Sequence, residues 1–128
     1  MPRTDLYVYR GARGDSSPLK EWLATLEKRQ AKIYAKCVAF ILELGEEGGE
    51  LRPPTSKCLR DGIFELRPKN GRVNYRILYF FHARPRCAVL SHGFTKEGEV
   101  PDIEIERAIR RRTEVTGDFE RHTLEWEI

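Results

Sequence analysis

The chain has 128 residues, of which 34% are charged and 40% hydrophobic, and its formal net charge is +3. This length corresponds to one compact domain. No run approaches the ~20 apolar residues that a bilayer span requires, which argues against a membrane protein. The first ten residues also lack the apolar core of a secretory signal, so the sequence predicts a cytoplasmic protein.

A strand and two helices are predicted in the N-terminal half. Residues 5–10 alternate polar with apolar side chains, which is typical of a short strand. Ser17 is a favourable N-cap for a helix whose apolar residues recur every three or four positions over 19–26. A second helical stripe follows over 34–42, and Gly45 is where we expect it to end.

The C-terminal half is richer in β-forming residues. We predict strands over 62–67, 72–82 and 87–95, joined by short turns into an antiparallel meander. A helix over 101–112 follows, with acids early and arginines late, as the helix dipole favours. For the tail, residues 113–128, an extra edge strand and a frayed terminus both stay open.

The predicted order is therefore β-α-α-β-β-β-α, and the fold class is α+β. We expect one domain over residues 1–112, with the two N-terminal helices packed on one face of a small antiparallel sheet. The opposite face would then be open and available for a functional site.

The cysteines argue against a disulfide framework and against a zinc site. Cys37, Cys58 and Cys87 are odd in number, far apart and without the closely spaced ligand pairs that structural zinc requires. We expect three reduced thiols, and no metal or other cofactor.

Positive charge is concentrated in the middle of the chain. From Lys57 to Lys96 there are nine Lys or Arg and two Asp or Glu, a balance of 9 − 2 = +7, which leaves 14 − 18 = −4 for the rest. Such segregation indicates an anionic partner for the middle segment.

Two arginines fall on predicted strands, where an unpaired charge is unfavourable. Alternation places Arg76 on one face of its strand, and it places Leu90, His92, Phe94 and Lys96 together on one face of the next. Two interpretations remain open. Glu65 pairs with Arg67 or Arg76 as a structural ion pair, or the arginines belong to a basic surface that holds phosphates beside aromatic rings.

Several of these runs together resemble a known family. The segments L-R-D-G-I-F-E-L-R, Y-R-I-L-Y-F-F and A-V-L-S-H-G-F-T-K-E-G-E-V-P-D-I-E-I-E-R-A resemble the RelE/ParE superfamily of type II toxins, and more closely its HigB-like, phage-derived branch, over residues 57–112. The resemblance implies a small α+β toxin that is neutralised by a cognate helix-turn-helix antitoxin. Most RelE and HigB relatives cleave mRNA on the ribosome without a metal, through attack of a 2′-hydroxyl on the adjacent phosphodiester.

The same resemblance assigns roles to individual residues. Arg67, Arg76 and Lys96 match basic positions of the family motifs and are expected to contact the phosphate and its transition state. His92 lies beside the third strand motif and is the candidate acid or base. Contacts to the RNA are expected from Lys57, Arg60, Arg72 and Tyr75.

Two alternatives to an mRNA endonuclease stay open. One is a ParE-like protein that inhibits DNA gyrase by binding it, and the other is a non-catalytic RNA- or protein-binding module from a prophage. The sequence leaves open the oligomeric state of the free chain.

Overall fold

The structure is a computed structural model that describes residues 4–11, 13, 16–82 and 87–127. Its elements are β1 (Asp5–Tyr9), α1 (Pro18–Arg29), α2 (Ala31–Glu47), the 3₁₀ helix η1 (Gly48–Glu50), β2 (Ser56–Arg60), β3 (Ile63–Leu66), β4 (Lys69–Asn70), β5 (Val73–His82), β6 (Cys87–Thr95), α3 (Asp102–Gly117), α4 (Phe119–His122) and β7 (Thr123–Glu125).

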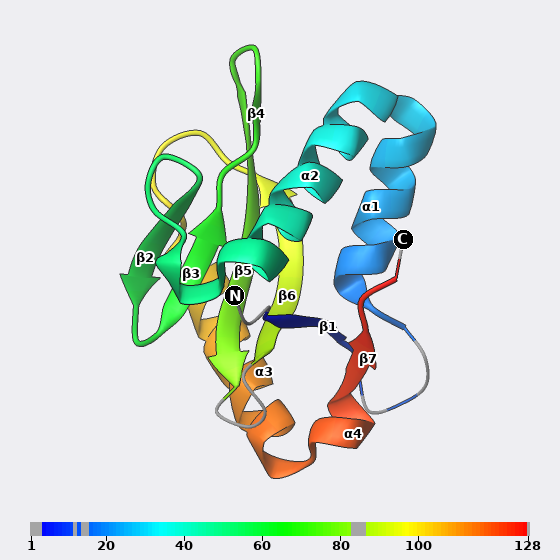
Figure 1. The fold of residues 1–128 in the computed structure, drawn as a ribbon, viewed down its shortest axis with the longest axis vertical. Helices are drawn as coiled ribbons and strands as arrows, with labels where there is room; N and C mark the ends of the chain where they lie inside the picture. Colours follow the sequence, from blue (N-terminus) through cyan, green and yellow to red (C-terminus); the bar gives the residue numbers. More distant parts are fainter. Residues whose placement is uncertain (1–3, 12, 14–15, 83–86, 128) are drawn as a thin grey trace.

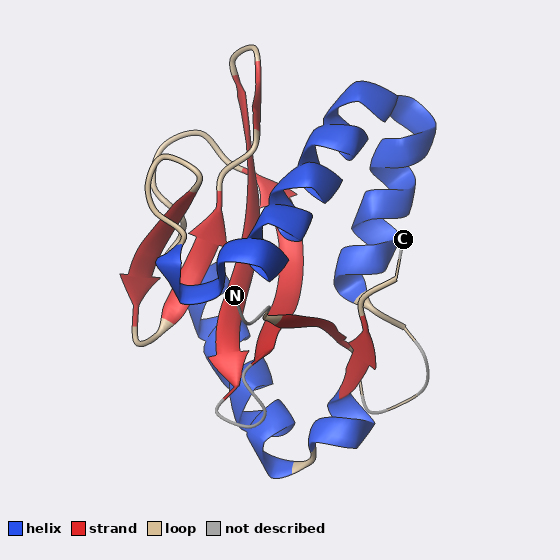
Figure 2. Cartoon of the chain, in the orientation of Figure 1, coloured by secondary structure: helices blue, strands red, loops and turns tan. Residues whose placement is uncertain are grey.

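One sheet organises the chain. Its strand order is β2-β3-β5-β6-β1-β7, with the short strand β4 paired to β5. Every pair of neighbouring strands is antiparallel except the pair of β1 and β6, which is parallel. Figures 1 and 2 show α1 and α2 side by side on one face of this sheet. The predicted α+β class, with two N-terminal helices on one face, is confirmed.

Helices α1 and α2 begin and pack as their sequences dictate. Ser17 accepts a hydrogen bond from the backbone N–H of Lys20 at 3.3 Å, and Pro18 occupies the first helical position, where its missing N–H costs nothing. The two helices bury their apolar faces against β5 and β6 (Figure 1). Fully buried members of this core include Leu19, Ile33, Cys37, Ile41, Ile77 and Leu90.

The opposite face of the sheet is not open, contrary to our expectation. Helix α3 packs against it, because Ile105, Ala108 and Val115 form an apolar stripe that is buried together with Leu78 and Phe80. The sheet is therefore sandwiched between helix layers. On this face, the described residues leave a hollow where α3 begins and the sheet extends beyond it.

A β-bulge in β6 changes which side chains share a face. Leu90 pairs with Tyr79 and His92 pairs with Leu78, so Ser91 is an extra residue in the ladder. We predicted that Leu90 and His92 share a face, and this is wrong. Leu90 is buried under α1 and α2, whereas His92 reaches α3.

Several element boundaries differ from those predicted. Residues 56–60, which lie outside the strands predicted from the sequence, form β2 paired with β3. Helix α2 continues beyond Gly45 to Glu47, and helix α3 continues five residues beyond 112 to Gly117. In the tail, β7 pairs with β1 at the edge of the sheet. Among the described residues, no helix combines the length and apolarity needed to cross a bilayer.

Candidate functional site

A hollow of about 550 Å³ lies between β2, β3, β5 and the start of α3, and we call it the α3-side hollow. It brings together residues from four segments of the chain, at 57–60, 65–67, 74–76 and 98–105. Its basic lining residues are Lys57, Arg60, Arg67 and Arg76. Its acidic lining residues are Glu65, Glu99 and Asp102. Four of the eight site residues predicted from the sequence therefore line one cavity.

Arg76 is held rigidly at the floor of the hollow. Its side chain is 6% exposed, and its Nη1 donates to Oε1 of Glu65 at 2.6 Å. Nη2 donates to the backbone oxygen of Gly98 at 2.6 Å and is 3.4 Å from that of Lys96. Its Nε has no hydrogen-bond partner among the described residues, although it is buried. A buried N–H without a partner is uncommon and requires an explanation.

The side chain of Arg67, unlike that of Arg76, is not held by an ion pair with another described residue. It follows the end of β3, and its backbone N–H donates to the oxygen of Thr55 at 2.9 Å, which fixes the main chain. The residue is half-buried, and its guanidinium forms no ion pair with another described residue. Its charge is therefore available to a ligand in the hollow.

The charge of Arg60 is offset by acids. Its guanidinium lies 2.6 Å from Asp61, 2.7 Å from Glu106 and 3.4 Å from Asp102. Hydrogen bonds to Glu106 and Asp61 raise the pKa of Arg60 above its usual range. Lys57 is exposed on β2, directly opposite Glu65 on β3. Lys57 and Arg67 thus contribute most of the uncompensated charge.

The comparison with known families covers this whole site. The family model of the phage-derived protein Gp49-like (DUF891) matches residues 21–113. The chain belongs to the Gp49-like family. The match runs from α1 into α3, so it includes every residue that lines the α3-side hollow. The family is toxin-like and related to the RelE and HigB type, which implies an antitoxin as partner. No curated protein matches the chain significantly.

In this Gp49-like protein His92 lies outside the hollow. Its Nε2 is 2.9 Å from Oε1 of Glu104, its Nδ1 is 2.8 Å from Oγ of Ser91, and it is 7% exposed. Burial lowers the pKa of His92 to about 4, although its hydrogen bond to the Glu104 carboxylate acts in the opposite direction. The imidazole is therefore neutral at pH 7.

Ser91, His92 and Glu104 have the composition of a hydrolase triad, but their environment does not suit one. Ser91 is fully buried, so its hydroxyl is not accessible to a substrate. Arg107 donates to the same Glu104 oxygen at 2.5 Å, and Arg111 reaches Ser91 at 3.4 Å. The set is a hydrogen-bond network that fastens α3 to β6.

The other predicted site residues lie elsewhere. Lys96 is exposed just beyond β6, and its backbone oxygen faces Arg76. Arg72 is exposed at the tip of the β4–β5 hairpin and does not line the hollow. Tyr75 is 4% exposed, and its hydroxyl donates to Oε1 of Gln30 at 2.8 Å. Burial of this ring leaves little surface on which a base could stack.

Three polar lining residues, Asn74, Glu99 and Asp102, were not singled out from the sequence. Asn74 shares a face with Arg76, so strand alternation contained the signal for it. Glu99 and Asp102 lie in the turn before α3 and at its first residue, where acids are also common as caps and dipole partners. The described residues contain no group of three or more His, Cys, Asp or Glu positioned to hold a metal ion.

Proposed function

We propose that this chain is the toxin of a type II toxin-antitoxin system, of the RelE/HigB type, and that it cleaves ribosome-bound mRNA in the cytoplasm. The observation that carries the proposal is the buried guanidinium of Arg76, whose Nε lacks a partner among the described residues in a hollow that also holds Arg67. When the substrate binds and displaces the atoms that now cover Nε, a phosphate oxygen would supply the missing acceptor. Arg guanidinium groups bind phosphate with two parallel hydrogen bonds.

The proposed reaction is an internal transesterification. The 2′-oxygen of one nucleotide forms a bond to the adjacent phosphorus, and the bond from phosphorus to the 5′-oxygen breaks. The 2′-hydroxyl loses its proton, the departing 5′-oxygen gains one, and a 2′,3′-cyclic phosphate remains. Negative charge grows on the phosphorus oxygens in the transition state. A cation fixed in advance, such as Arg76, stabilises that charge without reorganising, and Arg67 adds a second positive charge.

We propose that a carboxylate lining the hollow accepts the proton of the 2′-hydroxyl. Glu65 is fixed by Arg76, whereas Glu99 is exposed and free to approach a substrate. Lys96 lies beside the same turn, and we propose that its ammonium gives a proton to the departing 5′-oxygen. His92 has no part in this scheme, because it lies in the network beneath α3.

A non-catalytic binding module is the second candidate, and one observation favours it. The charges of Arg76 and Arg60 are both engaged by acids, so the hollow is less basic than its residue types suggest. A surface of this kind can bind an anion or a partner protein without reacting with it.

Translation in vitro separates the candidates. Purified protein is added to a translation reaction, and the mRNA is mapped by primer extension. The proposal predicts breaks at preferred codons that depend on ribosomes, and their loss in Arg67→Ala. Arg110→Ala, an exposed arginine on α3 outside the hollow, is the matched control and is expected to cleave normally. If the mRNA stayed intact with the wild-type protein, the nuclease hypothesis would be rejected. A non-catalytic binding module or a gyrase inhibitor would then be the remaining candidates.

A further inference from the structure

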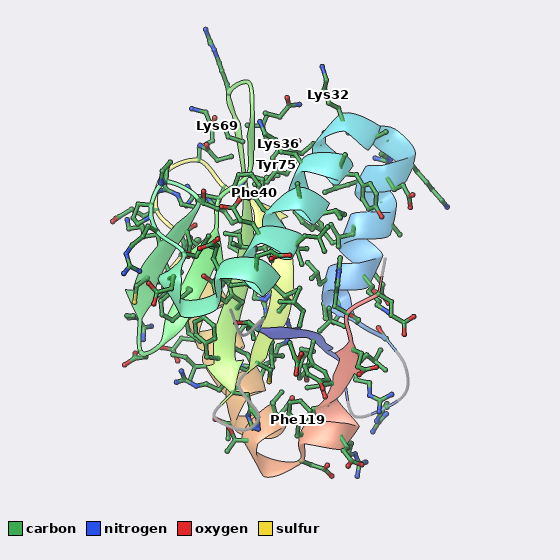
Figure 3. All side chains as sticks on the ribbon, viewed as in Figure 1. Lys32, Lys36, Phe40, Lys69, Tyr75 and Phe119 are labelled. Atoms are coloured by element: carbon green, nitrogen blue, oxygen red, sulfur yellow. The ribbon has the colours of Figure 1, made fainter. Side chains whose placement is uncertain are left out.

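A second concave surface lies on the other side of the same strands, and we call it the α2-side cleft. It has a volume of about 400 Å³, and its lining includes Lys36, Phe40, Arg67, Lys69 and Tyr75. Figure 3 shows Lys36, Phe40, Lys69 and Tyr75 near one another, between α2 and the β4–β5 hairpin, with Lys32 at the start of the same helix. The cleft is thus formed by residues more than thirty positions apart in sequence.

The cleft adjoins the α3-side hollow at the end of the sheet. Arg67, Asn74 and Arg76 line both concave surfaces. A ligand that contacts Arg67 from the hollow can therefore continue into the cleft without leaving the protein surface. An extended polymer would fit such a path, and a small anion would not need it.

Charge distinguishes the two surfaces. The hollow contains the acids Glu65, Glu99 and Asp102, whereas no acid is among the described residues that line the cleft. Lys36, Arg67 and Lys69 all lie there without a carboxylate partner among the described residues. Uncompensated cations around a cleft attract a polyanion.

Lys36 is held at the mouth of the cleft. Its Nζ donates to the backbone oxygen of Lys69 at 2.6 Å, which joins α2 to the β4–β5 hairpin. An ammonium has three N–H donors, so two remain for phosphate oxygens. Because the hydrogen bond positions this side chain in advance, less conformational entropy is lost when a ligand binds.

We infer that the α2-side cleft is a second phosphate-binding surface, which holds the backbone of the single-stranded RNA as it leaves the α3-side hollow around Arg67. The inference rests on the proposed function, because it assigns the occupant of the hollow to the same RNA strand. It adds Lys36 and Lys69 to the binding surface, and neither was among the site residues predicted from the sequence.

The test measures binding and cleavage separately. A fluorescein-labelled, short single-stranded RNA is titrated with protein at several salt concentrations without ribosomes, and the same proteins are assayed by primer extension. Each phosphate contact to a single strand contributes about 0.7 to the slope of log K against log salt, so Lys36→Ala/Lys69→Ala should reduce the slope by about 1.4. Both residues are exposed, so the variant is expected to fold.

The matched control also removes two exposed cations. Arg110→Ala/Arg121→Ala changes residues on α3 and α4, which line neither concave surface, and should keep the wild-type slope. If Lys36→Ala/Lys69→Ala kept the wild-type salt slope and ribosome-dependent cleavage were intact, the α2-side cleft would not bind RNA. The proposed nuclease function would be unaffected. A wild-type protein that neither binds the RNA nor cleaves mRNA would overturn both.

Discussion

Arg76 and Glu65 form an ion pair at 2.6 Å between adjacent strands, and both side chains are almost completely buried. Buried charges are costly to desolvate, so such a pair contributes little net stability, while an unpaired member is strongly destabilising. The pair therefore fixes the guanidinium in one orientation. This orientation directs two of its nitrogens to Glu65 and Gly98, while Nε is buried without a partner among the described residues.

The ion pair predicts a specific pattern of stability. Arg76→Met leaves the Glu65 carboxylate buried without its partner, and unfolding free energy should fall by about 3–5 kcal/mol. Replacing both residues, as Glu65→Leu/Arg76→Met, removes both charges and should recover most of that loss. Urea denaturation of the wild type, both single variants and the double variant measures the coupling.

The double variant also separates folding from function. It should be folded yet unable to cleave mRNA, because Arg76 is absent. If the loss of unfolding free energy in the double variant equalled the sum of the losses in the two single variants, the two residues would be energetically independent. That result would contradict the proposal that Glu65 orients Arg76.

Arg67 is predicted to act on the transition state and not on the fold. It is half-buried and its side chain has no ion pair with the described residues, so Arg67→Ala should change stability by less than about 1 kcal/mol. Loss of one donor to a developing oxyanion costs about 10²–10³ in rate. Growth arrest on induction should therefore disappear while the circular dichroism spectrum stays unchanged. Full toxicity of Arg67→Ala would contradict the proposed site.

His92 is predicted to make stability depend on pH. Its pKa is about 4 in the folded protein, against 6.5 as the reference value, because burial disfavours the charged form. The unfolded chain then binds more protons between these values, so stability is full above pH 6.5 and declines as pH falls towards 4. The decline should be on the order of 3 kcal/mol.

His92→Asn isolates this contribution. The difference in unfolding free energy between wild type and variant should shrink as pH falls over the same window, while mRNA cleavage at neutral pH is retained. A difference that does not vary with pH would show that His92 is not buried in neutral form. Loss of cleavage in a fully folded His92→Asn variant would return this residue to the catalytic scheme.

The amino-acid pattern contained much of the fold, because local periodicity determines which side chains share a face. Alternation along β5 by itself separates Tyr75 and Ile77, which lie under α1 and α2, from Leu78 and Phe80, which lie under α3. The same reasoning failed in β6, since nothing in the composition of that run marks Ser91 as the extra residue of a bulge. The position of the bulge depends on how β6 pairs with β5.

The candidate site was predictable only in part, for a similar reason. The arginines at 67 and 76 stood out because charge is unusual on a strand, and both line the hollow. Lys36 carried no such signal, since an exposed lysine on a helix is ordinary. Its approach to Lys69 arises from the packing of α2 beside the β4–β5 hairpin, a contact between segments 33 residues apart.

Gly93 is predicted to be required by the packing of α1 on the sheet. A methyl group added there would lie 2.8 Å from Cδ2 of Trp22 and closer still to two other carbons of the same ring. Carbon atoms pack at about 3.5–4.0 Å, so the ring would have to move. The ring of Tyr75, 6.3 Å away between centroids, restricts that movement. Gly93→Ala should therefore cost about 1–3 kcal/mol.

Gly117→Ala is the matched control for this substitution. Gly117 is the last residue of α3, and an added methyl group would have no described atom within 4 Å. Because alanine favours helix, the control should be neutral or up to about 1 kcal/mol more stable. Thermal unfolding of both variants measures the difference, and Trp fluorescence should change only in Gly93→Ala. Equal stability of the two variants would mean that Trp22 has room to move and that Gly93 is dispensable for docking α1.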